Sequence, residues 1–134
     1  MNTSEKIHKI FQMKTIAVVG MSPKPERPSH YVAMYLKENG YTIFPVNPGH
    51  REIGGLKCYP NLFEIPFDVD VVNVFRRPEH ALLIAESTIE IGAKALWLQD
   101  GVINEEAALL AEKAGLLVVM DDCMMRQHRI MIEI

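Results

Sequence analysis

The sequence predicts an α/β protein built on an open parallel sheet of about five strands, with helices on both faces. Two patterns favour this fold class. A helical stretch that ends in glycine and runs directly into an apolar segment occurs three times, at Gly40, Gly92 and Gly115. Glycine is the usual residue just past a helix, because it adopts the left-handed conformation at little cost. The apolar segments are continuous rather than alternating, which is typical of strands covered by helices on both faces.

The strands follow one another along the chain with helices between most of them. We predict strands over residues 15–20, 41–46, 70–75, 93–98 and 116–120. Because strands and helices alternate, we expect right-handed crossovers and a parallel sheet, which is a Rossmann-like arrangement. Residues 47–68 are the exception. Their glycines and prolines leave room only for a short strand near residues 56–59 and one helical turn.

Four helices are predicted from capping residues and from the spacing of apolar side chains. The first covers residues 3–12, and the second begins near Ser29. Pro78 suits the first position of the third helix, and Asn104 caps the fourth. The side chains expected to face the sheet are Ile7, Ile10 and Phe11; Val32, Ala33 and Leu36; Leu82, Ala85 and Ile89; and Ala107, Leu110, Ala111 and Ala114. A short segment after the last strand ends the chain.

Length and composition fit one small domain. The 134 residues correspond to a single domain over residues 1–134, with the helix in residues 1–13 packed on it. The formal net charge of −3 disfavours a nucleic-acid partner, since such proteins usually carry a basic stripe. The two cysteines, Cys58 and Cys123, form no CxxC motif, so we expect neither a disulfide framework nor a metal site. The longest clean apolar run, residues 116–120, is too short to cross a bilayer, and no signal peptide is evident. We therefore expect a cytoplasmic protein.

In an open parallel sheet, ligands bind beyond the carboxyl ends of the strands, where the strand order reverses. Every predicted strand here ends in polar or turn-forming residues. The segment after the first strand is the most informative. Gly20 ends an apolar strand just before a helix, a geometry that holds phosphate on helix N–H groups. Ser22 adds a hydroxyl donor, and Lys24 and Arg27 add positive charge.

This segment departs from the dinucleotide-binding pattern. Only the first glycine of the GxGxxG motif is present, and no acidic residue follows about 20 residues later to bind ribose hydroxyls. The second strand ends instead in Pro45-Val46-Asn47-Pro48. A phosphate-rich nucleotide is therefore favoured over NAD. An NADP-binding protein stays as an alternative, through the positive charge of Arg51.

Eight short segments carry a resemblance to a known family. They are Val18-Val19-Gly20-Met21-Ser22, Arg27-Pro28-Ser29, Tyr35-Leu36, Gly40-Tyr41, Pro45-Val46-Asn47-Pro48, Val74-Phe75-Arg76-Arg77-Pro78, Trp97-Leu98-Gln99-Asp100-Gly101 and Asp122-Cys123-Met124-Met125. With these segments in this order, the chain resembles the small single-domain CoA-binding proteins. That domain is similar to the N-terminal CoA-binding domain of the succinyl-CoA synthetase α subunit. The similarity covers residues 15–128.

The resemblance implies that CoA or acyl-CoA lies along the loops at the carboxyl ends of the strands. The pyrophosphate would lie against Gly20, Met21 and Ser22, and its charge would be neutralised by Lys24 and Arg27. The adenosine would be bordered by Asn47 and Pro48, and the next wall of the site would be formed by Phe75, Arg76, Arg77 and Pro78. The pantetheine arm would lie toward Gln99 and Gly101. CoA carries a 3′-phosphate, which agrees with extra cations and with no acid that binds the ribose.

The resemblance does not imply catalysis. The phospho-accepting histidine of the synthetase belongs to a second domain, for which 134 residues leave no room. We assign no catalytic residue, although His30 stands at a helix start where it would touch a phosphate. The pair Gln127-His128 departs from the family pattern, which has an acid before the histidine, so it is given no role. Cys123 is interpreted either as a buried structural cysteine or as one that forms a mixed disulfide with the CoA thiol.

Three hypotheses for function follow. The first is a non-catalytic module that binds CoA or acyl-CoA, and the second is an NADP-binding protein. The third is a subunit that becomes active only with a partner protein, although the sequence shows no motif that identifies one.

Overall fold

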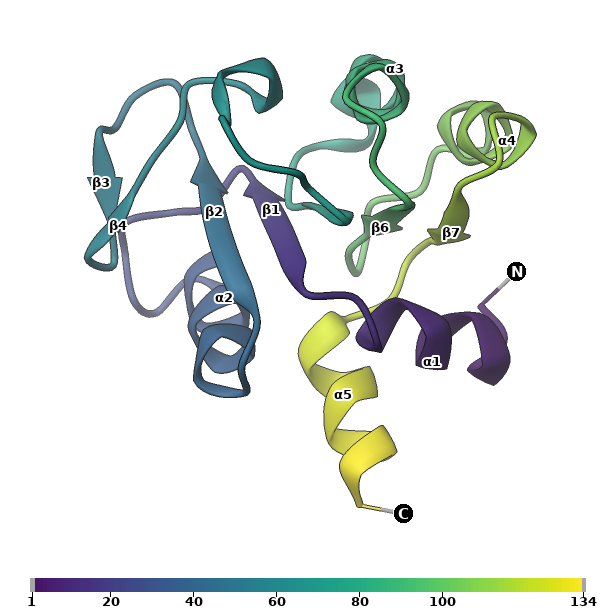
Figure 1. Cartoon of the computed structure of the whole chain (residues 1–134), viewed down its shortest axis with the longest axis horizontal. Coiled ribbons are helices and arrows are strands. Elements are labelled where there is room, and N and C mark those ends of the chain that lie inside the picture. The colour runs from purple at the N-terminus through teal and green to yellow at the C-terminus, as the bar shows by residue number, and fades with distance from the viewer. Residues whose placement is uncertain (1, 134) are drawn as a thin grey trace.

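The computed structural model describes residues 2–133 as a five-stranded sheet with helices on both faces (Figure 1). Its elements, in chain order, are α1 (Ser4–Phe11), β1 (Thr15–Val19), α2 (Pro28–Glu38), β2 (Thr42–Val46), β3 (Glu52–Ile53), β4 (Leu56–Lys57), the short 3-10 helix η1 (Leu62–Glu64), β5 (Val71–Val74), the 3-10 helix η2 (Pro78–His80), α3 (Ala81–Glu90), β6 (Ala95–Leu98), α4 (Glu105–Lys113), β7 (Leu117–Val119) and α5 (Met124–Ile132). The predicted α/β fold and its five main strands are confirmed.

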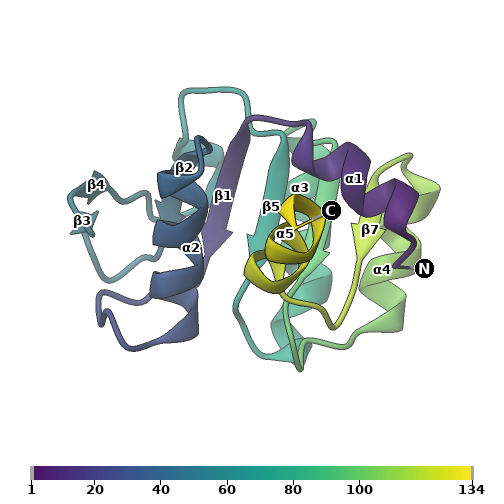
Figure 2. The same ribbon diagram turned by 90° about the horizontal axis from the view of Figure 1, so that it is seen from below.

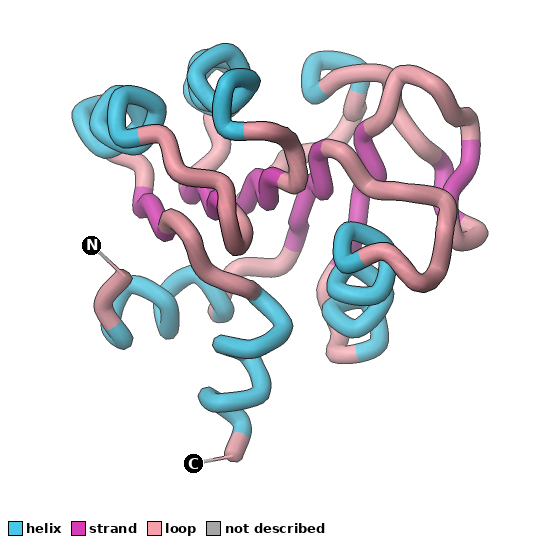
Figure 3. Tube along the Cα trace, turned by 180° about the vertical axis from the view of Figure 1, so that it is seen from behind, coloured by secondary structure: helices cyan, strands magenta, loops and turns pink. Residues whose placement is uncertain are grey.

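All neighbouring strands of the main sheet are parallel, in the order β2-β1-β5-β6-β7. Helices α3 and α4 cover one face, and α1, α2 and α5 cover the other, as Figures 1 and 2 show from two directions. Viewed from behind, α5 leads away from the sheet (Figure 3), and Met131 near its end is only partly buried against the core. Met124 and His128 are accordingly the buried residues of α5.

The strand order reverses between β1 and β5. From β1 the chain crosses to β2 on one side, and it later returns to place β5 on the other side of β1. The loops that follow β1 and β5 therefore leave the sheet edge side by side. This is the switch point, where open α/β sheets bind their ligands.

Each face of the sheet has its own apolar core. Alternate strand residues such as Val19, Val74 and Leu98 pack toward α3 and α4. Their neighbours, including Val18 and Trp97, pack toward α1, α2 and α5. The Trp97 ring is fully buried, and its Nε1 donates a hydrogen bond to the carbonyl of Asp122 at 2.9 Å, which ties β6 to the start of α5.

Three predicted inward positions on the helices lie outside the apolar cores: Ile89 and Leu110, which are half-buried, and Ala114, which is exposed. On α3 the buried face is Ala81, Ala85 and Thr88, whereas Ile89 is only half-buried. Thr88 is accommodated because its hydroxyl donates to the carbonyl of Ile84 at 2.6 Å. Helix α4 ends one residue before Ala114, which is exposed as the C-cap.

The irregular region between β2 and β5 contains a small antiparallel hairpin of β3 and β4, followed by η1. The predicted short strand near residues 56–59 corresponds to β4. One residue of this region also reaches the main sheet. Tyr59 bridges Val46 in parallel, donating from its amide to the carbonyl of Pro45 and accepting from the amide of Asn47, both at 2.9 Å. The outer edge of β2 is thus covered at its end.

The opposite edge of the sheet is covered by the start of the chain. The Asn2 side chain donates to the carbonyl of Met120 at 2.7 Å and accepts from its amide at 3.0 Å. Lys6 donates to the carbonyl of Val118 at 3.1 Å. Within residues 2–133, no helix reaches the length and apolar character that crossing a bilayer requires.

Candidate functional site

The loops after β1 and β5 touch at Gly20. Its φ is +88°, and a Cβ placed there would stand 2.4 Å from the carbonyl oxygen of Phe75 and 2.9 Å from Cδ of Arg76. Backbone hydrogen bonds hold the strand ends at this spacing, from Gly20 to Val46 and from Phe75 to Val19, both at 2.9 Å. The site therefore requires glycine at this position, both for its conformation and for the close approach.

The rest of the β1 loop is fastened to α2. The amide of Ser22 donates to Oγ of Ser29 at 2.9 Å, and the Ser22 hydroxyl accepts from the amide of Lys24 at 3.1 Å. His30 donates from Nδ1 to the Ser22 carbonyl at 2.8 Å, because a carbonyl can only accept. His30 is buried and holds the loop in place. The prediction that it touches a phosphate stays untested.

Two other predicted residues serve the scaffold as well. The Met21 side chain is fully buried, so only its backbone faces the loop region. Asn47 donates from Nδ2 to the Met21 carbonyl at 3.0 Å and accepts from the amide of Gly49 at 3.0 Å. The Asn47 side chain thus connects the loops after β1 and β2.

Four exposed cations flank the point of contact. Lys24 and Arg27 follow β1, and Arg76 and Arg77 follow β5. None of the four forms an ion pair with any residue in the described part of the chain. Arg27 is also the N-cap residue of α2, whose first position is Pro28. Unpaired positive charge beside a helix N-terminus favours an anionic ligand such as phosphate.

A cavity of about 610 Å³ opens between α2 and α5; we call it the α2–α5 cavity. Its lining residues are Pro28, Ser29, Tyr31, Val32, Phe75, Gln99, Asp100, Cys123, Met125, Arg126, Arg129, Ile130 and Glu133. Phe75 and Gln99 were predicted from the sequence. The residues that α5 contributes to this lining were not predicted, because the sequence pattern predicts only a short segment after the last strand. The apolar and basic residues of 124–132, read with helical spacing, were the pattern that indicates it.

A second cavity of about 220 Å³, the α3 cavity, lies on the other side of the sheet. It is lined by Val19, Val46, Pro48, Pro60, Asn61, Leu62, Phe63, Arg76, Leu83, Ile84 and Ser87. Pro48 and Arg76 were predicted. The consecutive residues Phe75 and Arg76 thus line different cavities. Gly20 packs against both of these residues.

The remaining predicted residues lie in the loops outside both linings. Pro78 is the first residue of η2, the turn that leads into α3, and its carbonyl accepts from Asn104 at 3.0 Å. Gly101 has φ +81°, and its amide donates to the Asp121 carboxylate at 2.8 Å. That hydrogen bond joins the loops after β6 and β7.

A buried pair of amides lies beside the α2–α5 cavity. Gln99 donates from Nε2 to Oδ1 of Asn73 at 2.8 Å, and both side chains are buried. Asn73 Nδ2 is the one buried side-chain nitrogen or oxygen without a hydrogen-bond partner in the described residues. Buried polar groups are nearly always paired, so such an exception calls for an explanation.

Helix α5 is held over the cavity by charge. Arg126 donates to both carboxylate oxygens of Asp100 at 2.9 and 2.7 Å, and to Asp122 at 2.8 Å. The hydrogen bond from Arg126 lowers the pKa of the Asp100 carboxyl. Gln127 also donates to both oxygens of Asp122, at 3.2 and 3.1 Å. The start of α5 is thereby fixed to the end of β6.

His128 is enclosed by aromatic rings. The rings of Phe11, Tyr35 and Tyr41 stand edge-on to it at 5.2, 5.4 and 5.8 Å, and the Tyr35 hydroxyl lies 2.8 Å from its Nδ1. Burial lowers the pKa of His128. Its position indicates a packing role. Among the described residues, no group of three or more histidine, cysteine or acidic side chains is arranged to hold a metal ion.

The reversed strand order, the glycine contact and the unpaired cations are typical of Rossmann-like domains that bind nucleotides. Sequence comparison makes this specific, since the profile of the CoA binding domain matches residues 14–129. The chain belongs to this family, which confirms the resemblance found in the sequence.

Similar proteins fall into two groups, and the first consists of chains of comparable size. An uncharacterized protein of Bacillus subtilis, YneT, is 43% identical over 117 residues, which cover 87% of each chain. A hypothetical protein from Pyrococcus horikoshii has a similar structure, with a TM-score of 0.93 and 43% identity over 97% of this chain and 92% of that one.

The second group consists of much larger ligases. An ADP-forming acetate–CoA ligase of Archaeoglobus fulgidus is 26% identical over 88% of this chain but only 19% of its own length. A dinucleotide-forming acetyl-coenzyme A synthetase of Ca. Korarchaeum cryptofilum has a TM-score of 0.75 and 25% identity, with 86% of this chain and 28% of that one aligned. The chain therefore spans roughly a fifth to a quarter of these ligases.

Proposed function

We propose that this protein binds CoA or acyl-CoA across the switch point, without a catalytic centre of its own. One observation carries the proposal: the consecutive residues Phe75 and Arg76, against which Gly20 packs, line two different cavities on opposite sides of the sheet. CoA has a nucleotide at one end and a long amide-containing arm at the other, with phosphates between them. A ligand of that shape fits two cavities on either side of a cationic loop contact. Membership of the CoA-binding family supports the same ligand.

In this arrangement the phosphates lie over the β1 loop. Lys24 and Arg27 supply charge on one side, and Arg76 and Arg77 supply it on the other. The adenosine end occupies the α3 cavity beside Pro48. Asn47 fixes the loop that carries Pro48 through its hydrogen bond to the Met21 carbonyl. The pantetheine arm enters the α2–α5 cavity, where Gln99 offers an amide to an arm that itself carries two amides.

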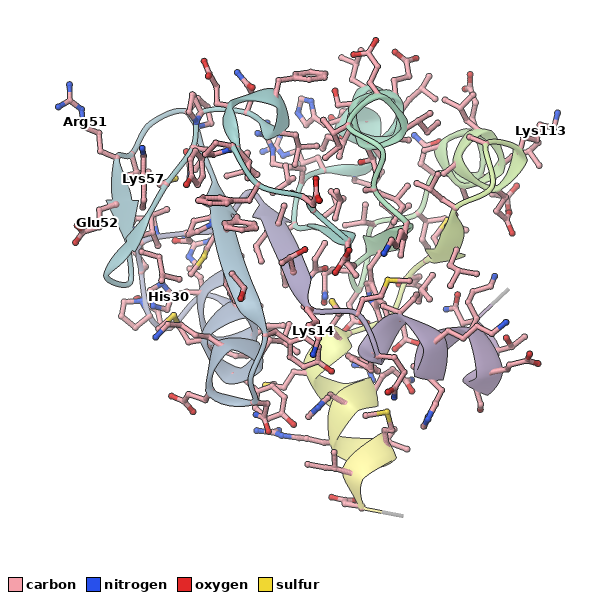
Figure 4. The ribbon with its side chains drawn as sticks, in the orientation of Figure 1. Lys14, His30, Arg51, Glu52, Lys57 and Lys113 are labelled. Carbon is pink, nitrogen blue, oxygen red and sulfur yellow. The ribbon has the colours of Figure 1, made fainter. Side chains whose placement is uncertain are left out.

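The alternative of an NADP-binding protein depends on Arg51. This residue is exposed just before β3, and its side chain extends away from the body of the protein (Figure 4). The cations that flank Gly20 offer a better site for the additional phosphate. A role as a subunit that acts with a partner agrees with the ligases that contain a similar segment, and a pull-down from the source organism would test it.

Titration calorimetry under reducing conditions with CoA, 3′-dephospho-CoA, NADH and NADPH tests the proposal. We expect CoA to bind most tightly and 3′-dephospho-CoA to bind more weakly, because it lacks one doubly charged group. Tighter binding of NADPH than of CoA would refute the proposal in favour of the alternative.

A further inference from the structure

Beyond binding, we propose that Cys123 forms a reversible mixed disulfide with the thiol of a bound pantetheine-type ligand. The α2–α5 cavity would then serve as a thiol-exchange site. This inference rests on the proposed function, because the ligand's thiol must enter that cavity.

The position of Cys123 supports this chemistry. Cys123 is the N-cap residue of α5 and lines the α2–α5 cavity together with Phe75 and Gln99. Its thiol makes no capping hydrogen bond and has no other hydrogen-bond partner within residues 2–133. Cys123 packs in the core on this face of the sheet, but its thiol is held by no hydrogen bond, and the residue forms part of the cavity wall that a ligand would contact.

An independent observation indicates that a polar ligand belongs in the same cavity. Gln99 is only 3% exposed and lines the cavity, and its Nε2 donates a hydrogen bond to Oδ1 of Asn73. Its Oε1 accepts no hydrogen bond from the described residues. Beside it, Asn73 Nδ2 lacks a partner. Asn73 is fully buried and is not part of the cavity lining, so a ligand does not reach its Nδ2. The Oε1 of Gln99 belongs to a lining residue and is left to accept a hydrogen bond from a ligand that carries amides.

Cys58 provides the internal comparison. It is also buried, but its thiol donates to the carbonyl of Asn47 at 3.4 Å and lies 3.9 Å from the carbonyl of Tyr59. It lines neither cavity. Burial raises the pKa of the Cys58 thiol, which disfavours the thiolate needed for exchange. The two cysteines of the chain therefore differ in access and in hydrogen bonding.

The reaction is a thiol–disulfide exchange with the symmetrical disulfide of CoA as the oxidised co-reactant. The Cys123 thiolate attacks one sulfur of that disulfide, and a new S–S bond forms as the old one breaks. The second CoA leaves as a thiolate and takes up a proton, so one disulfide is consumed and one is formed. A free thiol reverses the step in the same way.

The test is mass spectrometry of the intact protein after incubation with CoA disulfide. We expect one added CoA, removed by dithiothreitol and located by proteolysis on the peptide that contains Cys123. Cys123→Ser should gain no mass, whereas Cys58→Ser should gain as much as the wild type. Oxidised glutathione should react at least about tenfold more slowly, because it lacks the nucleotide that binding uses to bring the sulfur into place.

Peptide mapping of the wild type gives the same information if Cys58→Ser does not fold. Modification of Cys58, or equal rates with oxidised glutathione, would overturn the inference. The absence of an adduct from protein that binds CoA in the reducing titration would overturn it and leave the proposed function intact. Absence of any CoA binding in that titration would overturn both.

Discussion

Replacing Gly20 with alanine tests whether the contact between the β1 and β5 loops shapes the site. The new Cβ meets two obstacles. The φ of +88° costs an L-residue about 1–2 kcal/mol. The added carbon would also stand 2.4 Å from the Phe75 carbonyl, which is backbone and must move. Forcing an extra carbon into a packed position costs a further 1–3 kcal/mol or so. We expect Gly20→Ala to lower the free energy of unfolding by about 2–5 kcal/mol.

Gly115→Ala is the matched control. Its φ is +92°, but nothing lies within 4 Å of a Cβ at that position. It therefore has the conformational cost alone, about 1–2 kcal/mol. Both substitutions restrict the unfolded chain equally, so this effect cancels in their difference. The difference of about 1–3 kcal/mol isolates the close approach at Gly20.

Urea unfolding followed by the fluorescence of Trp97 measures both values, since this is the single tryptophan and it is fully buried. Calorimetry should show a further distinction. Gly20→Ala should weaken CoA binding, because it pushes apart the strand ends that carry Phe75 and Arg76, one in the lining of each cavity, and Gly115→Ala should not. Equal stability losses in the two variants would refute the close contact as the origin of the effect.

Three further predictions address charge, the buried amides and pH. Arg76→Ala should weaken CoA binding by about 1–3 kcal/mol. Lys113→Ala, on α4 at the far end of the molecule (Figure 4), should leave CoA binding unchanged. If calorimetry gives the two variants equal affinities for CoA, the assignment of Arg76 to the phosphates is wrong. Gln99→Leu should lower the free energy of unfolding in urea by about 1–3 kcal/mol, because it leaves the Asn73 side chain wholly unpaired. Adding Asn73→Leu should restore most of that free energy. A double variant no more stable than Gln99→Leu argues against a stabilising pair. The folded-state pKa of His128 lies below its ordinary 6.5, so stability should be complete above that pH and fall as pH drops toward the folded-state value. His128→Phe should lose this decline, which begins as the pH falls below the ordinary pKa of 6.5, and an unchanged profile would assign the decline to another group.

The scaffold was well predicted from the sequence because the patterns that define it are local. Glycines after helices and continuous apolar runs located all five main strands to within two residues. The errors arose where tertiary contacts override helical spacing. Thr88 displaces Ile89 from the buried face of α3 because a hydroxyl bonded to its own helix can be buried.

The site was predicted less completely, for a different reason. Lys24 and Arg27 were predicted from their charge, and Arg76 and Arg77 from the family resemblance; the structure shows all four exposed, and their contact with a ligand stays a prediction. The cavities, by contrast, depend on how distant helices pack. Helix α5 illustrates this: Arg126 lines the α2–α5 cavity because it pairs with Asp100, 26 positions earlier in the chain. Asn47 and Met21 show the converse, since polar or apolar type alone does not reveal whether a side chain serves the ligand or the scaffold.

The covered edges of the sheet have a consequence for how this protein associates with others. An uncovered outer strand is a template onto which another chain can add by backbone pairing. Here the Asn2 amide takes the place of a neighbouring strand beside β7, while Tyr59 and the donor-less Pro45 occupy the end of β2. Strand addition is therefore blocked at one point on each side. A second copy or a partner that recognises helices and loops instead makes its contacts through side chains, which can change without disturbing the sheet.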